Sequence, residues 1–248
     1  MKTAVLVICL LSWISVAAPI WVSGDVTFQS RYIWRGAVFN DRGVLQPWVA
    51  AGTDDAAITL WGNMDLTDQN SWLEDGEVQD PTGKFTEIDL ILNYTHVLGP
   101  VSLTAGFNKY WYPNTAFSET AASELTLAAA YDAILAPTVT FAYSLEDAEG
   151  LYTGLCISHY TGLSDIVSAG AWVNLGYGDE KHNGYYYGVP EAGLADLTVG
   201  VSAPVAFPCG ITATPMVEYA SLLKSEIADV FAEPSNLRGG LSLTYSFL

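Results

Sequence analysis

The chain has 248 residues, half of them hydrophobic, and its 27 acidic and 9 basic side chains give a formal net charge of −18 at pH 7. Nucleic-acid binding needs a basic face, so this charge balance disfavours a nucleic-acid partner. After the N-terminal segment, no apolar run is long enough to form a transmembrane helix.

The first 18 residues are typical of a Sec signal peptide. Lys2 supplies a positive charge, residues 4–16 form an apolar run, and the small residues at 17–18 suit a signal peptidase. We predict cleavage after Ala18, with cleavage after Gly24 as the alternative. The apolar run is short and no basic segment follows it, which argues against a membrane anchor. Residues 19–248 are therefore expected to form a single exported domain.

From about residue 25 onwards, apolar and polar residues alternate in about twelve segments. A period of two places the apolar residues on one face of a β-strand. Residues 222–232 have helix-like spacing, and we expect a helix there, in the loop before the last strand. Strand counts from 10 to 14 fit the same pattern. The predicted strands cover residues 25–34, 44–52, 58–66, 87–95, 101–112, 124–131, 139–145, 151–160, 166–177, 194–203, 211–219 and 237–248.

The gaps between these strands alternate in length. Those after the second, fourth, sixth, eighth and tenth strands are about four to seven residues long, and most of the others are longer. Outer-membrane barrels have this arrangement, with short turns at the periplasmic rim and longer loops outside. We therefore predict an all-β fold, a transmembrane antiparallel up-and-down β-barrel of about 12 strands, with both ends at the short-turn rim. Soluble sandwiches also repeat short strands, but without this coupling to gap length.

The polarity of the two strand faces favours the same fold. The predicted outer face is apolar, with aromatic residues towards the strand ends, as in the interface girdles of membrane barrels. The opposite face carries Thr, Ser, Asn, Gly and a few charges. A soluble lipocalin-like barrel would turn its apolar face inward instead. The girdle candidates are Trp34, Tyr94, Trp111, Tyr131, Tyr177, Tyr219, Tyr245 and Phe247.

Two segments resemble known outer-membrane sequences. The C-terminal strand, Leu241–Leu248, resembles the signal read by the barrel-assembly machinery, although Phe247 is penultimate and Leu248 is last. The segment 25–36 is similar to the opening of the TorF-type family of outer-membrane porins, in which a serine, a tyrosine and an Arg-Gly pair recur. This resemblance implies an outer-membrane channel whose solute is undefined. The corresponding residues here are Ser30, Tyr32, Arg35 and Gly36.

No pattern in the sequence indicates catalysis. Enzymes on twelve-stranded barrels, such as outer-membrane phospholipase and lipid A deacylase, need a histidine held by polar partners near the outer rim. Here His96 and His159 are predicted at the short-turn rim, and His182 in a polar loop. The sequence has no phosphate loop, metal cluster or nucleophile elbow, so we expect no catalytic residue, metal or cofactor. Cys156 and Cys209 are expected to stay unlinked, because one lies mid-strand and the other in a turn.

Charged residues on the predicted inward face are the candidate pore-lining residues. The basic candidates are Arg31 and Arg35 on the first strand and Arg238 on the last. Closure of the barrel makes these strands neighbours, so the arginines would form one basic patch. A field between basic and acidic walls orients polar solutes in many pores. In a small barrel, the same charges can instead pair and plug the lumen. The acidic candidates are Asp65, Glu87, Asp89, Glu124, Asp196 and Glu218.

Together these patterns favour an outer-membrane channel for passive diffusion of small polar solutes or ions, with a preference for cations. The alternatives are a structural or surface-interaction barrel with a plugged lumen, and a soluble periplasmic β-protein. The expected partners are outer-membrane lipid, the barrel-assembly machinery through the C-terminal strand, and small polar solutes. The acidic loops would form a solvated surface, or bridge lipid phosphates through divalent cations.

Overall fold

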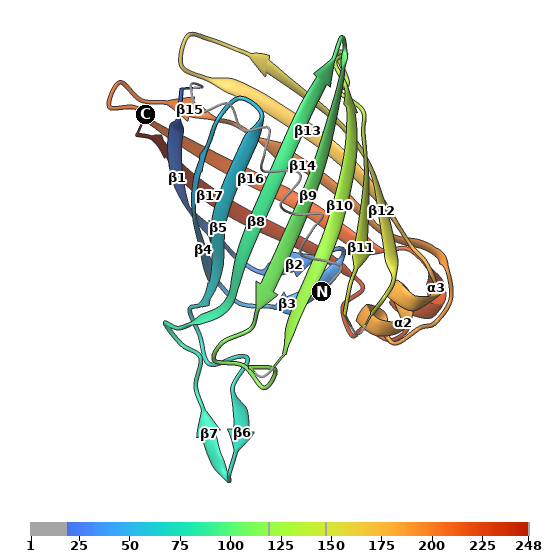
Figure 1. Cartoon of the computed structure of the whole chain (residues 1–248). Coiled ribbons are helices and arrows are strands. Elements are labelled where there is room, and N and C mark those ends of the chain that lie inside the picture. The colour runs from blue at the N-terminus through green and yellow to red at the C-terminus, as the bar shows by residue number, and fades with distance from the viewer. Residues whose placement is uncertain (1–18, 119, 147, 248) are drawn as a thin grey trace, which may run out of the picture.

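The computed structural model describes residues 19–118, 120–146 and 148–247, which form a closed antiparallel β-barrel (Figure 1). Its sheet has 13 strands, of which the short β15 (Val205–Ala206) is an extra strand beside β16, so twelve strands close the wall. The predicted up-and-down barrel of about twelve strands is confirmed. The wall strands are β1 (Trp21–Gln29), β4 (Val44–Gly52), β5 (Ala56–Asp65), β8 (Phe85–Leu98), β9 (Val101–Trp111), β10 (Ala121–Tyr131), β11 (Thr138–Ser144), β12 (Leu151–Gly162), β13 (Ser168–Gly178), β14 (Gly193–Ser202), β16 (Ile211–Leu222) and β17 (Ser235–Ser246).

The barrel closes between its first and last strands, as predicted. β1 pairs antiparallel with β17, with Asp25 opposite Thr244, and pairs with β4 on its other side. Every other neighbouring pair of wall strands is consecutive along the chain, which is the up-and-down order. The predicted signal peptide, residues 1–18, lies outside the described residues.

The connections at the two rims differ in length, which confirms the predicted alternation. At one rim the chain turns tightly, for example at residues 53–55 between β4 and β5 and at residues 99–100 between β8 and β9. β1 starts and β17 ends at this rim. The connections at the other rim are longer and carry the smaller elements, among them a hairpin of β6 (Trp72–Glu74) and β7 (Glu77–Gln79) that projects from the barrel at the bottom of Figure 1.

Two short helices lie at the long-loop end, α2 (Glu180–Tyr187) and α3 (Ser225–Ala228). Within the described residues, no helix has the length and apolar character needed to cross a membrane. The helix predicted over 222–232 exists only as α3. It is shorter because β16 continues to Leu222, whose backbone N–H donates to the Pro234 carbonyl beside β17.

The two faces of the wall have opposite polarity, as predicted. Outward side chains such as Val26, Leu60 and Leu127 are apolar and 44–54% exposed. Inward side chains such as Gln46 and Asn63 are polar and at most 7% exposed. Apolar outside and polar inside is the arrangement of a barrel built for a lipid bilayer.

The first predicted strand is wrong at its C-terminal end. β1 stops at Gln29, and the chain then leaves the wall and forms a separate hairpin of β2 (Tyr32–Trp34) and β3 (Ala37–Asn40). Arg31 and Arg35 therefore lie beyond β1 rather than on it. Tyr32 and Trp34 alternate with other residues in the hairpin as they would in a wall strand. The period of two therefore did not reveal that the chain leaves the wall after Gln29.

Trp34 is also wrong as a girdle residue, because it belongs to this hairpin and contacts Tyr186 of α2. Cys156 and Cys209 are both free thiols, in agreement with the prediction that they are unlinked. Girdle candidates that are exposed on the wall, at 40–59%, are Trp111, Tyr131, Tyr177, Tyr219, Tyr245 and Phe247.

A small hydrophobic core lies at the long-loop end of the barrel, where the two helices and the hairpin meet. Ile227 of α3 is fully buried and packs in one cluster with Tyr187 of α2, Ala37 of β3 and Leu222 of β16. This cluster fixes the hairpin and both helices to the end of the wall, and so positions the polar residues described next.

Candidate functional site

The β2–β3 hairpin crosses the lumen at the long-loop end. The Tyr32 hydroxyl donates to Glu87 of β8 over 2.8 Å, and Arg238 of β17 donates to the backbone carbonyl of Ile33 over 3.1 Å. Arg35 forms an ion pair with Glu124 of β10. Because β10 and β17 lie on opposite sides of the ring, a segment that contacts both must span the interior (Figure 1).

A tight turn at Arg35 and Gly36 joins β2 to β3. Arg35 has a φ of 46° and Gly36 a φ of 78°. Positive φ values favour glycine, which has no Cβ to clash with its own backbone. A Cβ at position 36 would also lie 2.7 Å from the Cβ of Asp196 on β14, so the turn sits directly against the wall.

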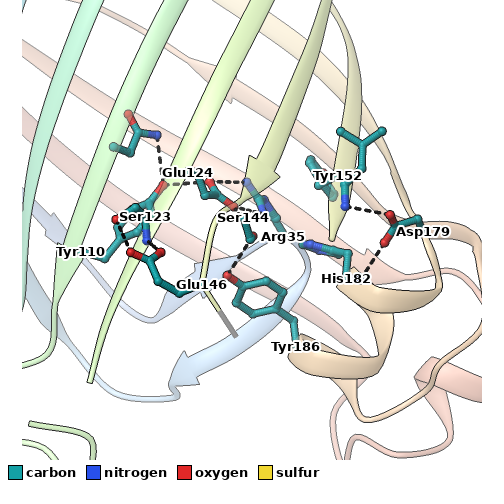
Figure 2. Close-up of polar contacts among 12 residues, drawn as sticks. Arg35, Tyr110, Ser123, Glu124, Ser144, Glu146, Tyr152, Asp179, His182 and Tyr186 are labelled. Atoms are coloured by element: carbon teal, nitrogen blue, oxygen red, sulfur yellow. Dashed lines mark hydrogen bonds and ion pairs between the residues drawn. The ribbon is translucent and has the colours of Figure 1, made fainter. Parts of the chain in front are cut away.

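Arg35 is the centre of the polar network in the lumen (Figure 2). Its Nη1 and Nη2 each donate to one oxygen of Glu124 over 2.9 Å, so the two planar groups meet in a fork. Its guanidinium carbon lies 4.1 Å from the ring centroid of Trp34 and 4.2 Å from that of Tyr152. Burial acts to lower the pKa of Arg35, but the charge of Glu124 and the hydrogen bonds to it outweigh this effect and raise it.

Neighbouring hydroxyl groups hold Glu124 in place. Tyr110 on β9 donates to this carboxylate over 2.9 Å, and Ser144 on β11 donates over 3.3 Å. Ser144 lies 3.4 Å from the hydroxyl of Tyr186, so the network continues to α2 (Figure 2). The Arg35–Glu124 pair therefore connects the hairpin, three wall strands and a helix.

His182 lies beside this network on α2. Its backbone N–H donates to Asp179, the N-cap residue, and its ring is packed against four aromatic rings, including Tyr186 at 4.7 Å and Tyr152 at 5.3 Å. The side chain is fully buried, and neither ring nitrogen has a hydrogen-bond partner among the described residues. Burial, and then the nearby charge of Arg35, lower the pKa of His182 to about 3. The imidazole is therefore neutral at pH 7.

Asp65 belongs to a separate polar cluster at the end of β5. Asn63 and Thr86 donate to its Oδ1 over 2.9 and 3.0 Å, and Asn70 donates to its Oδ2 over 2.9 Å. Gln46 extends the cluster by donating to Asn63 over 3.0 Å. These amide and hydroxyl donors satisfy the buried carboxylate without a cation.

The other carboxylates of β8 and β14 are buried with few partners. Glu87 accepts from the Tyr32 hydroxyl, and Asp196 accepts from the Tyr152 hydroxyl over 2.9 Å. One oxygen of Asp196 and one oxygen of Asp89 are buried with no hydrogen-bond partner among the described residues. These two parts of the wall, on opposite sides of the lumen, therefore present acceptors rather than donors.

The predicted basic patch is wrong. Arg238 pairs with Glu218, opposite it on β16, at 2.6 Å, and Arg35 reaches across the lumen to Glu124. Arg31 pairs with Glu233 at the rim, over 2.7 Å, and also donates to Asn236. Each of these arginines is held by a carboxylate. For Arg35 and Arg238, which lie inside the lumen, an uncompensated cation would be costly.

The nine candidate residues thus fall into separate groups. Arg35, Glu124 and Asp196 gather around the hairpin, Glu87 and Asp89 lie beside it on β8, and the remaining residues form the pairs and cluster above. That they line a conducting pore stays a prediction.

The residues that sequence reasoning missed are the aromatic partners of Arg35 and the residues of α2. An all-polar and aromatic helix has no apolar stripe, so its period could not be seen. Capping residues were the available signal, because Asp179 precedes the helix and Gly188, with a φ of 73°, ends it.

No protein-family model matches the chain, and no curated protein matches it in sequence. Solved outer-membrane barrels are similar in fold. The KdgM porin aligns with a TM-score of 0.56 over 91% of this chain and 99% of its own, at 12% identity. A structure of the KdgM porin in complex with disordered oligogalacturonate gives a TM-score of 0.52 over 92% and 99%, at 11% identity.

The translocator domain of the autotransporter NalP from Neisseria meningitidis is also similar, with a TM-score of 0.50 over 99% of this chain and 94% of its own, at 12% identity. At these identities the likeness shows the fold alone. The barrel architecture is thus shared with outer-membrane porins and with a translocator, and the choice of function depends on the lumen.

Proposed function

We propose that this protein is an outer-membrane channel for passive diffusion of small polar solutes or ions, with a preference for cations. The observation that carries the proposal is the charge of the lumen. Two of its buried carboxylates, Glu124 and Glu218, are paired with arginines. The other five have no ion pair among the described residues, which favours cations over anions inside the barrel. The buried carboxylates are Asp25, Asp65, Glu87, Asp89, Glu124, Asp196 and Glu218.

The ligand of the KdgM porin complex does not suit this lumen. Oligogalacturonate carries a carboxylate on each sugar, and surplus buried carboxylates repel such a polyanion. We therefore transfer the channel role from the porin neighbours but not that solute. The more specific resemblance to the TorF-type family stays a prediction.

The apolar outer face supports outer-membrane lipid as the surroundings of the barrel, since those side chains would otherwise face water. Tyr245 near the end of β17 and Phe247 just after it form an aromatic pair, whose ring centroids are 4.9 Å apart. This end supports recognition by the barrel-assembly machinery. Sec export through residues 1–18 belongs to the same proposal.

Bilayer conductance tests the channel role. Purified, refolded protein in a planar bilayer is expected to give discrete current steps, and a KCl gradient should give a reversal potential on the cation-selective side. A correctly folded barrel without conductance steps, with its fold shown by heat-dependent gel mobility, would contradict the proposal. Anion selectivity would contradict the cation preference alone.

A second function is favoured by two other observations. The β2–β3 hairpin spans the lumen, and the projecting β6–β7 hairpin exposes Leu73 and Val78 at 73% and 69%. A plugged barrel that binds a partner through its loops would show both features. Deletion of residues 71–80 separates the two functions, because it should abolish surface binding but leave conductance unchanged.

A further inference from the structure

Asp89 is a buried carboxylate of the lumen wall that the polar network leaves without a partner. It faces inward from β8 and is only 6% exposed. Its Oδ1 accepts no hydrogen bond from any described residue. A buried charge of this kind is costly unless a positive partner or a proton joins it. Asp89 is therefore a position where a positively charged ligand would be stabilised.

Aromatic side chains flank this carboxylate. In the sheet register, Trp61 of β5 stands directly opposite Asp89 on one side, and Tyr110 of β9 stands opposite on the other. Residues opposite each other have Cβ atoms about 4.5–5.5 Å apart. Tyr32 of the hairpin adds a third ring, whose centroid is 5.9 Å from that of Trp61. Asp89 is thus placed between aromatic rings that come from both neighbouring strands and from the hairpin.

The unmatched polar atoms in this part of the wall are acceptors. Asn108 lies two residues from Tyr110, on the same face of β9, and its Nδ2 donates to the Tyr110 hydroxyl over 3.0 Å. The Oδ1 of Asn108 is left buried without a partner, like the Oδ1 of Asp89 on the adjacent strand. A ligand that satisfies these atoms must donate hydrogen bonds.

The local charge also favours a cation. Glu87 lies two residues from Asp89 on the same face of β8, and its partner is the neutral Tyr32 hydroxyl. Arg35, the arginine of the hairpin, is already paired with Glu124. Asp89 and Glu87 therefore share a region without a cation of their own among the described residues.

These features select a protonated amine over a metal ion. Ammonium groups donate hydrogen bonds and are attracted to aromatic faces. Ca²⁺ prefers about six to eight oxygen ligands, and among the described residues no three His, Cys, Asp or Glu side chains come together as a metal site. We propose that Asp89, with Trp61 and Tyr32, binds the ammonium group of small alkylamines inside the lumen. The inference rests on the proposed channel function, since the amine must enter the barrel.

Calorimetric titration of putrescine into the refolded barrel in detergent tests the site. Asp89→Asn should weaken putrescine binding at least tenfold, because the charge is lost while the shape is kept. Trp61→Leu, which retains the carboxylate, should weaken it about threefold to tenfold through the lost ring. Asp132→Asn is the matched control, because Asp132 is an exposed carboxylate in the turn between β10 and β11. Heat-dependent gel mobility establishes that each variant is folded.

Equal binding by the wild type and Asp89→Asn would overturn the proposal, and so would binding of putrescine no tighter than that of K⁺. If Trp61→Leu binds like the wild type, the aromatic part of the site is refuted. Bilayer recordings separate this inference from the channel role. Binding that depends on Asp89 in a barrel without conductance would leave the site standing and refute the channel. Conductance without putrescine binding would refute the site and leave the channel role standing.

Discussion

Removal of the Arg35 side chain is the sharpest test of the lumen network. In the wild type, the side chains of Arg35 and Glu124 are only 12% and 1% exposed and form a bidentate pair. Arg35→Ala leaves the Glu124 carboxylate buried with only the Tyr110 and Ser144 hydroxyls as donors. Breaking a buried pair from one side costs about 3–5 kcal/mol. The lost contacts with the Trp34 and Tyr152 rings place this variant towards the upper end.

The structure offers a matched control for this variant. Arg42 also pairs with a carboxylate, that of Asp41, but at 3.8 Å and with its side chain 60% exposed. Exposed pairs of this kind contribute about 0–1 kcal/mol, so Arg42→Ala should change little. In the double variant Arg35→Ala/Glu124→Gln no unpaired charge remains, and part of the loss should be recovered, with a coupling of about 0.5–3 kcal/mol.

Two readouts are needed, because the hairpin can leave the lumen before the wall unfolds. Urea unfolding in lipid vesicles measures the free energy of unfolding of the barrel, and single-channel conductance reports whether the hairpin still spans the lumen. If the hairpin stays, the unfolding midpoint of Arg35→Ala should fall. If the hairpin leaves, conductance should rise instead. An unchanged midpoint together with unchanged conductance, both equal to those of Arg42→Ala, would refute the reasoning.

Three further predictions follow from single residues. Gly36→Ala should destabilise the folded barrel by about 1–3 kcal/mol in urea unfolding, because of its positive φ and the contact with Asp196, whereas Gly99→Ala, at a turn with a φ of 60° and nothing within 4 Å, should cost less. The pKa of His182 is lowered to about 3 in the fold, whereas in the unfolded chain it is about 6.5. The free energy of unfolding is therefore at its full value at pH 7, and it should decrease as the pH falls below about 6.5, by about 2 kcal/mol at pH 5. His182→Phe should remove this part of the pH dependence of unfolding. Lys224 pairs with Glu191 at the rim, over 2.9 Å, and because water screens such a pair, Lys224→Ala should leave the urea midpoint close to that of the wild type.

The sequence was sufficient to predict the wall of the barrel but not the contacts inside its lumen. The wall repeats one rule, apolar outside and polar inside, so Leu60 and Asn63 each follow from their place in an alternating segment. The side chains inside the lumen are arranged by contacts between residues that are far apart in the sequence. The pair of Arg238 with Glu218 could have been suggested by neighbouring strands, but the pair of Arg35 with Glu124 joins residues 89 positions apart. No local pattern specifies such a pair, and the inward turn at Arg35 and Gly36 resembles the end of an ordinary strand.

The hairpin also has a consequence for how the chain assembles. Arg238 binds the carbonyl of Ile33, Arg31 binds Glu233, and the Gly239 N–H donates to the Ser30 hydroxyl. The hairpin and the two residues before it are therefore tied to β17 and the loop before it, by contacts between residues 202–209 positions apart. Contacts of such long sequence separation form late and slow the overall folding rate. β17 thus has two tasks, since it completes the wall beside β1 and holds one side of the hairpin in the lumen. Until β17 joins the wall, the hairpin is held by other contacts, among them those of Tyr32 and Arg35 with the opposite side of the barrel, so sealing of the wall coincides with the last contacts of its interior.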